Sequence, residues 1–289
     1  MNTRIVALEN LNSALQEDWV DRKRKPYVCG TKAYIPVKEG HPFQVSLPPR
    51  RPYTGRGYHM IGPMAILHGR RPSHAEVETL MRWCRPRGIL WIKSYTGVKR
   101  IPDAELIAGK GGEVLHRENG ISFWLDPARV MFAQGNREEK ARMKKIIGKG
   151  ERVADMCAGI GYFSIPAALS GAKVHAMDLN RVAFGYLERN ILENGVESSV
   201  FAQCGDCRDL LQGSYDRFII GHYDSIMMLP TALEHAHEDS ILHVHSSGIT
   251  TPDIGSLIRR AGFYADIQTR RVKKTGPGQW HYVQDVVLS

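Results

Sequence analysis

The chain has 289 residues, of which 43% are hydrophobic and 24% charged, a composition typical of a folded globular protein. This composition excludes wholesale disorder, a collagen-like repeat and a small disulfide scaffold. No run of about 18 apolar residues could form a membrane-spanning helix, and the first residues lack the apolar stretch of a secretory signal. The five cysteines are sparse and odd in number, which predicts reduced thiols in a cytoplasmic protein.

Positive charge is concentrated in the first part of the chain. Lys and Arg total 39 and Asp and Glu total 30, and residues 1–130 contain 21 of the basic side chains but only 12 of the acidic ones. Such an excess favours a polyanionic partner, because contacts to phosphates release condensed counterions. A basic surface that is merely solvated is the alternative.

Residues 1–130 are predicted to form a small basic α+β domain. Ser73 and Glu76 have the spacing of a capping box at the start of a helix, and segments 89–95 and 120–126 have the β-branched and aromatic content of strands. Aromatic side chains among the basic residues could stack nucleobases, although most strand aromatics belong to a core. The candidate RNA-binding residues are Arg22, Lys23, Arg24, Lys25, Arg50, Arg51 and Arg56.

From residue 131 to residue 289 strands alternate with helices in units of about 30 residues, which predicts parallel βαβ topology. Strands are expected at 152–156, 173–180, 198–206, 217–223 and 240–248. The tail contains two extended runs joined by Gly-Pro-Gly, which predicts a terminal hairpin at the antiparallel edge of the sheet. We therefore expect an α/β, Rossmann-like domain of seven strands that follows the smaller domain.

Three acidic residues are expected at the carboxyl ends of neighbouring parallel strands. Asp155 precedes a turn that contains Gly159 and Gly161, Asp178 ends the next strand, and Asp206 ends the third. Open α/β sheets bind ligands at this edge, where a carboxylate can accept hydrogen bonds from ribose hydroxyls or an adenine amino group. The pattern suits S-adenosylmethionine as a cofactor; helix capping is the alternative for any single Asp.

At these segments the chain resembles the superfamily of tRNA guanine-37 N1-methyltransferases. The resemblance rests on DMCAGIGYFSIP, AMDLNRVAFGYLERNILENG and GDCRD, and it extends upstream to AYIPVKEG, RGYHMIGPMAILH and the segment from AELIAGKGG to EEKARM. It covers the chain from about residue 30 to the end. It implies a class I methyltransferase fold.

Two branches of the superfamily differ at one strand end. The N1-methyltransferases carry Asn-Leu-Pro after the fourth strand, whereas this chain has Gly221-His222-Tyr223-Asp224 there. That segment, together with Phe132-Ala-Gln-Gly135-Asn136, resembles the wybutosine-synthesizing aminocarboxypropyl transferases. Ala133 and Gln134 stand where that branch has Ser-Pro, so serine contacts are not carried over.

The resemblance implies transfer of the 3-amino-3-carboxypropyl group of S-adenosylmethionine to C7 of 4-demethylwyosine at position 37 of phenylalanine tRNA. The partner would be the anticodon region of that tRNA, with neither a membrane nor an obligate protein partner. Two alternatives stay open: a guanine-37 N1-methyltransferase, and a non-catalytic tRNA-binding module with a vestigial cofactor pocket.

The resemblance also implies site residues. Asp178 would hold the ribose, Asp206 and the backbone of Cys207 the adenine, and Lys140 the cofactor carboxylate. The full set of expected cofactor contacts is Ala133, Lys140, Asp155, Gly159, Asp178, Leu179, Asp206 and Cys207. His222, Tyr223 and Asp224 are the candidates for a general base.

Two weaker patterns involve metal-ligand residue types. Cys204 and Cys207 have CxxC spacing, but no second pair completes four zinc ligands. His243 and His245 share one face of a strand, where buried or hydrogen-bonded histidines are more common than ligands. We expect no metal site.

Overall fold

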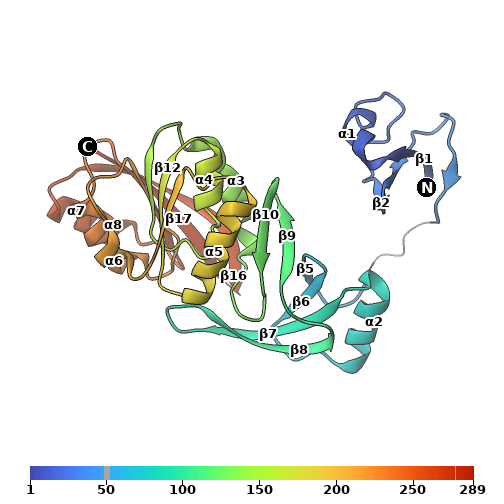
Figure 1. The fold of residues 1–289 in the computed structure, drawn as a ribbon, viewed down its shortest axis with the longest axis horizontal. Coiled ribbons are helices and arrows are strands. Elements are labelled where there is room, and N and C mark those ends of the chain that lie inside the picture. Colours follow the sequence, from blue (N-terminus) through green and yellow to red (C-terminus); the bar gives the residue numbers. More distant parts are fainter. Residues whose placement is uncertain (49–52, 277) are drawn as a thin grey trace. The chain divides into compact units, whose positions relative to one another are not determined.

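The computed structural model describes residues 1–48, 53–276 and 278–289, which form two compact units, Met1–Thr54 and Gly55–Ser289. Helices and strands are labelled in Figure 1. No helix in the described residues is both long enough and apolar enough to cross a membrane. The boundary expected at residue 131 therefore lies inside the second unit, where the chain passes from smaller sheets to the large one.

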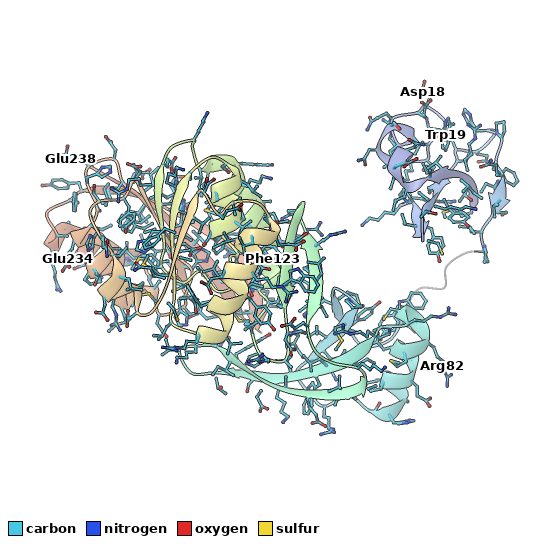
Figure 2. The ribbon with its side chains drawn as sticks, in the orientation of Figure 1. Asp18, Trp19, Arg82, Phe123, Glu234 and Glu238 are labelled. Carbon is cyan, nitrogen blue, oxygen red and sulfur yellow. The ribbon has the colours of Figure 1, made fainter. Side chains whose placement is uncertain are left out.

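The first unit is a small antiparallel sheet. Its strands are β1 (Asn2–Ala7), β2 (Tyr27–Cys29), β3 (Lys32–Pro36) and β4 (Val45–Ser46), in the order β2-β3-β1-β4, with short helices η1 (Leu8–Asn10) and α1 (Leu11–Ala14) after β1. Val20, Ala33 and Ile35 form its buried core. Trp19, labelled in Figure 2, lies beneath the Arg4 guanidinium at 4.6 Å.

The second unit begins with a four-stranded sheet and a hairpin. The sheet contains β5 (His59–Ile61), β6 (Met64–His68), β7 (Gly88–Thr96) and β8 (Ile101–Gly109), and the hairpin contains β9 (Val114–Glu118) and β10 (Ile121–Leu125). Helix α2 (His74–Cys84) connects the parallel strands β6 and β7, and Ser73 and Glu76 form the predicted capping box at its start. Capping satisfies N–H groups that the helix leaves unpaired.

The large sheet has seven strands, as the sequence predicts, in the order β13-β12-β11-β14-β15-β17-β16. Its strands are β11 (Arg152–Asp155), β12 (Lys173–Asp178), β13 (Val200–Cys204), β14 (Arg217–Ile220), β15 (Ile241–Ser246), β16 (Ala265–Gly276) and β17 (Gln279–Leu288). Strands β11 to β15 run parallel, and β17 pairs antiparallel with both β15 and β16. This confirms the α/β fold class and the terminal hairpin.

Helices cover both faces of the large sheet. The one face is covered by η2 (Gln134–Asn136), α3 (Arg137–Ile146), α4 (Ser164–Leu169) and α5 (Arg181–Glu193), and the other by α6 (Cys207–Leu210), η3 (Ser225–Met227), α7 (Leu229–Glu234) and α8 (Thr251–Arg260). On each face, the helices and the sheet together bury one of two hydrophobic clusters. Parallel strands buried on both sides explain the nearly continuous apolar runs in their sequences.

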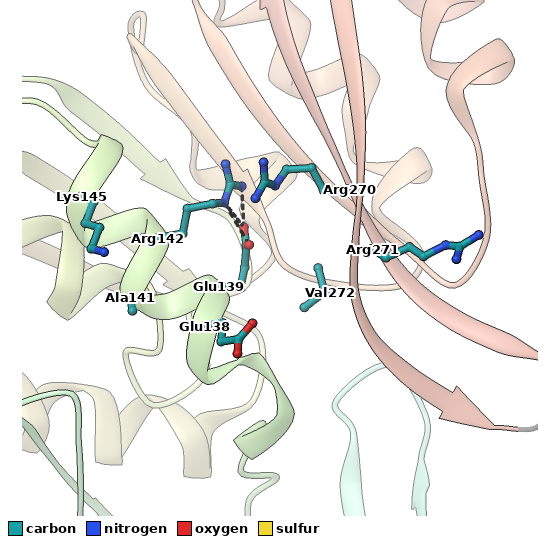
Figure 3. A pocket seen from close by; sticks show the side chains of 8 residues that line it. All are labelled: Glu138, Glu139, Ala141, Arg142, Lys145, Arg270, Arg271 and Val272. Carbon is teal, nitrogen blue, oxygen red and sulfur yellow. Dashed lines mark hydrogen bonds and ion pairs between the residues drawn. The ribbon is translucent and has the colours of Figure 1, made fainter. Parts of the chain in front are cut away.

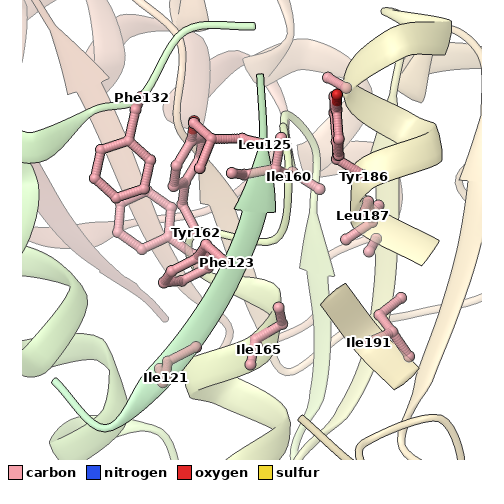
Figure 4. Close-up of a cluster of buried hydrophobic side chains, with 14 of the residues drawn as sticks. Ile121, Phe123, Leu125, Phe132, Ile160, Tyr162, Ile165, Tyr186, Leu187 and Ile191 are labelled. Atoms are coloured by element: carbon pink, nitrogen blue, oxygen red, sulfur yellow. The ribbon is translucent and has the colours of Figure 1, made fainter. Parts of the chain in front are cut away.

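The first of these clusters joins the large sheet to the region before it. Ile66 and Leu90 of the four-stranded sheet, and Phe123 of β10, belong to the same cluster as Ile160 and Leu187. Figure 4 shows Phe123 beside Phe132 and Tyr162, with Leu187 across β10. The Asn190 Oδ1 on α5 accepts the Trp124 N–H at 2.6 Å, which fixes the hairpin to that helix. Residues 55–130 are therefore built into one body with the Rossmann-like region.

Candidate active site

The turn after β11 is held by the carboxylate at the end of β12. Asp178 accepts the Gly159 N–H at 2.7 Å and the Asn180 N–H at 2.8 Å. Gly159 has φ +58°, a conformation that side chains with a Cβ rarely adopt. Burial raises the pKa of Asp178, and the two N–H groups oppose that rise. Because each carboxylate oxygen has a second lone pair, Asp178 can still accept hydrogen bonds from a ligand.

Asp155 lies beneath that turn. Its side chain is fully buried and accepts the Ser164 hydroxyl at 2.6 Å, and burial raises its pKa to about 7. Asp155 therefore lies in the interior, beneath the turn, and its hydrogen bond to Ser164 holds the first residue of α4. Leu179, which follows Asp178, is 41% exposed at the same edge.

At the end of β13, Asp206 caps helix α6 and forms an ion pair. Its carboxylate accepts the Arg208 N–H at 3.0 Å and lies 2.6 Å from the Arg208 guanidinium. The hydrogen bond and charge of Arg208 lower the pKa of Asp206. Cys207 is buried with its sulfur 3.6 Å from that of Met228. A ligand at Asp206 would share the carboxylate with Arg208.

Lys140 has a partner that the sequence does not reveal. Its ammonium is buried, lies 2.5 Å from the Glu118 carboxylate, and is 4.6 Å from the centre of the Phe132 ring and 5.5 Å from that of Tyr162. The charge that was expected to bind a cofactor carboxylate is therefore already neutralised. Ala133, at the N-terminal end of η2, follows Phe132 directly and lies beside this cluster.

The three general-base candidates follow β14 and have different environments. His222 is mostly buried, its Nδ1 accepts the Asp224 N–H at 3.1 Å, and its Nε2 has no hydrogen-bond partner among the described residues. Tyr223 lies edge-on to His281, with ring centres 5.4 Å apart. The Asp224 side chain is 69% exposed. Of the three, His222 has the buried, unpaired nitrogen that a ligand would satisfy.

A hairpin tip that sequence analysis missed reaches this edge of the sheet. Asn180 donates to the Lys99 carbonyl between β7 and β8 at 3.2 Å. The Arg100 guanidinium lies 5.6 Å from the Tyr95 ring and 5.4 Å from the Tyr223 ring. A cation between two aromatic rings beside the strand ends suits a planar, polar ligand. The glycine turn at 97 predicts a hairpin tip, but nothing in the sequence shows where the tip lies.

The histidines of β15 are hydrogen-bonded, as expected. The His243 Nδ1 donates to Asp285 at 2.6 Å, and its Nε2 accepts from the Arg217 guanidinium at 2.7 Å. The His245 Nδ1 is 2.9 Å from the His281 Nε2. Within the described ranges, no group of three or more His, Cys, Asp or Glu side chains could hold a metal ion.

Two cavities in the second unit lie apart from the predicted cofactor residues. One, of about 330 Å³, lies between α3 and β16 (Figure 3) and is lined by Glu138, Glu139, Ala141, Arg142, Lys145, Arg270, Arg271 and Val272. The other, of about 410 Å³, is at the opposite, amino-terminal edge of the sheet beside Lys173 and His175. None of the predicted cofactor residues lines either cavity.

The predicted RNA-binding residues fall in several environments. The side chains of Arg22, Lys23, Arg24 and Lys25 are all exposed. Arg24 lies 3.5 Å from Asp21. Arg56 is partly buried and donates to the His68 carbonyl. Arg50 and Arg51 lie outside the described residues. Contact of these residues with RNA stays a prediction.

Comparisons with known proteins converge on one family. The family model for the TRM5/TYW2 methyltransferase domain matches residues 114–272. A curated tRNA(Phe) (4-demethylwyosine(37)-C(7)) aminocarboxypropyltransferase of Methanocaldococcus jannaschii is 34% identical over 244 residues, which cover 80% of this chain and 97% of the relative.

Two solved structures show the same similarity. Pyrococcus horikoshii TYW2 in complex with MeSAdo has a TM-score of 0.71 at 28% identity and covers 81% of this chain and 91% of its own. Pyrococcus abyssi Trm5b has a TM-score of 0.74 at 26% identity and covers 100% of both chains.

Proposed function

This chain belongs to the TRM5/TYW2 methyltransferase domain family, and from that premise we propose that it is an aminocarboxypropyl transferase acting on tRNA. It transfers the 3-amino-3-carboxypropyl group of S-adenosylmethionine to C7 of 4-demethylwyosine at position 37 of phenylalanine tRNA. Methylthioadenosine is the second product. The observation that carries the proposal is similarity to a relative named for this reaction. The chain is 34% identical to that relative, and the match covers 97% of the relative's length.

The cofactor fits the edge formed by the carboxyl ends of β11, β12 and β13. Asp178 offers free lone pairs to the ribose hydroxyls, and the Gly159 turn brings backbone close to the ligand. Asp206 and the Cys207 backbone stand at the neighbouring strand end, where the adenine would lie. The sulfonium supplies the electrophile, so the protein has to bind and orient.

The reaction is an in-line displacement. The C7 carbon of the base forms a bond to the γ-carbon of the methionine moiety, the bond from that carbon to sulfur breaks, and sulfur leaves with the electron pair as a neutral thioether. The base then loses the C7 proton. Orientation of the cofactor decides which carbon is attacked, because all three carbons on the sulfonium are activated. His222 is the candidate to accept the proton, since its Nε2 is buried and unpaired among the described residues.

The acceptor enters beside Arg100 and Tyr223. Stacking between aromatic rings and a guanidinium is a common way to hold an unpaired RNA base. We place the anticodon region of the tRNA there, with the exposed basic cluster Arg22–Lys25 as a second contact. The proposed reaction requires no obligate protein partner, and a tRNA substrate agrees with the cytoplasmic location expected from the sequence.

The second candidate is guanine-37 N1-methylation, because Trm5b of Pyrococcus abyssi matches the whole of this chain. Against it, Gly221-His222-Tyr223-Asp224 replaces Asn-Leu-Pro after β14. A vestigial pocket is the third candidate, and the geometry of Asp178 and Gly159 argues against it.

The by-product separates these candidates. The protein is incubated with S-adenosylmethionine and with tRNA that carries either 4-demethylwyosine or guanine at position 37, and nucleosides and by-products are identified by mass spectrometry. We expect methylthioadenosine with the first tRNA only. Adenosylhomocysteine with the guanine tRNA would establish the methyltransferase instead. Absence of both products, with no thermal stabilisation by S-adenosylmethionine, would leave an RNA-binding module.

A further inference from the structure

Lys273 lies at the same edge of the sheet as the candidate cofactor residues. Ser246, the last residue of β15, pairs with Tyr282 of β17, and the residue before it in β17, His281, pairs with Lys273 of β16. Because β15 is parallel to β11, β12 and β14, its end marks the carboxyl edge of the sheet. Lys273 is therefore level with the strand ends that carry Asp178.

The side chain of Lys273 packs against the turn that begins α3. A Cβ on Gly135 would lie 2.5 Å from the Lys273 Cδ, so the lysine occupies the space that the missing side chain leaves open. That turn contains Ala133, one of the expected cofactor contacts. Lys273 thus reaches a segment that the family resemblance implies contacts the cofactor.

Lys273 also differs from the other buried cations of this region. Lys140 is paired with Glu118, Arg142 with Glu139 and Asp285, and Arg217 with Glu151. Lys273 is partly buried and has no carboxylate partner among the described residues; the charges that act on it are those of Lys140 and Arg100. Burial, followed by those two charges, lowers the pKa of Lys273 to about 8. A partly buried ammonium without a carboxylate partner among the described residues is a candidate to bind an anion.

We propose that Lys273 is the oxyanion-binding residue of the site, and that the oxyanion is the carboxylate of the cofactor's aminocarboxypropyl group rather than a phosphate of the RNA. This inference rests on the proposed function. Lys140 is already paired with Glu118, whereas Lys273 has no carboxylate partner among the described residues and touches the turn that contains Ala133. A carboxylate held there fixes the far end of the chain whose γ-carbon is attacked.

The test compares two ligands that differ in the proposed group. Lys273→Gln removes the charge, and Lys274→Gln is the matched control, because Lys274 is the exposed neighbour on the same strand. The full-length proteins are titrated by calorimetry with S-adenosylmethionine, which has the carboxylate, and with methylthioadenosine, which lacks it. Affinity for tRNA is measured over a range of salt concentrations. Thermal unfolding verifies folding, and Lys273→Met serves as a second variant.

We expect Lys273→Gln to weaken S-adenosylmethionine binding about tenfold or more and to change methylthioadenosine binding less than about twofold. Lys274→Gln should change neither. An equal loss for both ligands would show a structural role and overturn the inference. A second outcome would also overturn the inference: cofactor binding stays unchanged, while the slope of log tRNA affinity against log salt concentration falls by about one. That result would assign Lys273 to a phosphate of the RNA. If the unaltered protein binds neither ligand, the proposed function itself fails.

Discussion

At the scale of single residues, Asp178 connects the glycine turn to the proposed ribose site. Replacing it with Ala removes the acceptor for the Gly159 and Asn180 N–H groups and for the ribose. We expect S-adenosylmethionine to bind about 1–3 kcal/mol more weakly, the range for leaving a buried polar group without its hydrogen-bond partner. Isothermal calorimetry measures the change.

Asp216 provides the matched control for that substitution. It precedes β14 at the opposite edge of the sheet and likewise accepts a backbone N–H, that of Arg152 at 2.6 Å. Asp216→Ala should leave cofactor affinity unchanged. Equal affinity in the Asp178 variant and the unaltered protein would exclude the ribose role.

Residue patterns predict positions along the chain better than they predict pairing in space. The three acidic residues lie at strand ends, as the spacing indicates, because strand length fixes where each Asp falls. The partner of Lys140 could not be predicted, since Glu118 comes from a hairpin 22 positions earlier in the chain whose packing depends on the shared core. The same limit applies to Lys273, because only the folded structure shows that no carboxylate among the described residues pairs with it.

At the scale of elements, local signals predict the alternating strands and helices of the large sheet. Gly-Pro-Gly correctly marks the hairpin of β16 and β17, and the Ser73 capping box marks the start of α2. The sequence predicts only part of the four-stranded sheet β5-β6-β7-β8, because its edge strands β5 and β8 contain few buried apolar residues. What the sequence cannot show is how β17 is fixed beside β15.

A partly buried charged network secures that antiparallel junction and predicts a stability effect. Asp285 on β17 accepts from His243 on β15 at 2.6 Å and from both Arg142 nitrogens at 2.9 Å. Burial raises the pKa of Asp285, but these hydrogen bonds outweigh it and hold the pKa below its usual value. Asp285→Ala should lower the free energy of unfolding by about 2–4 kcal/mol, because His243 and Arg142 lose a partner.

Chemical denaturation at neutral pH measures that loss. Asp266→Ala is the control, since Asp266 is an exposed carboxylate on the neighbouring strand β16. We expect the control to stay within about 0.5 kcal/mol of the unaltered protein. A loss of the same small size in Asp285→Ala would show that the network does not stabilise the junction.

At the scale of the whole molecule, the two groups of similar structures cover different shares of this chain. The TYW2 structure from Pyrococcus horikoshii covers 81% of this chain, whereas Trm5b covers all of it. The candidate cofactor residues all lie in the second unit, and the first unit carries the exposed basic cluster Arg22–Lys25. The sequence predicts a basic excess in residues 1–130, and the boundary after Thr54 divides that stretch between the two units.

Replacing Arg22, Lys23 and Arg24 together with Ala tests whether that cluster contacts RNA. Each phosphate contact contributes roughly 0.7–0.9 to the slope of log affinity against log salt, so loss of the cluster should flatten the slope by about two. The full three contacts are not expected, because Arg24 lies 3.5 Å from Asp21 and is partly neutralised. Lys149, Arg152 and Lys173, exposed at the amino-terminal edge of the large sheet, form a control set of equal charge whose replacement should leave the slope unchanged. Equal slopes for the two triple variants would mean that residues 22–24 are only a solvated surface.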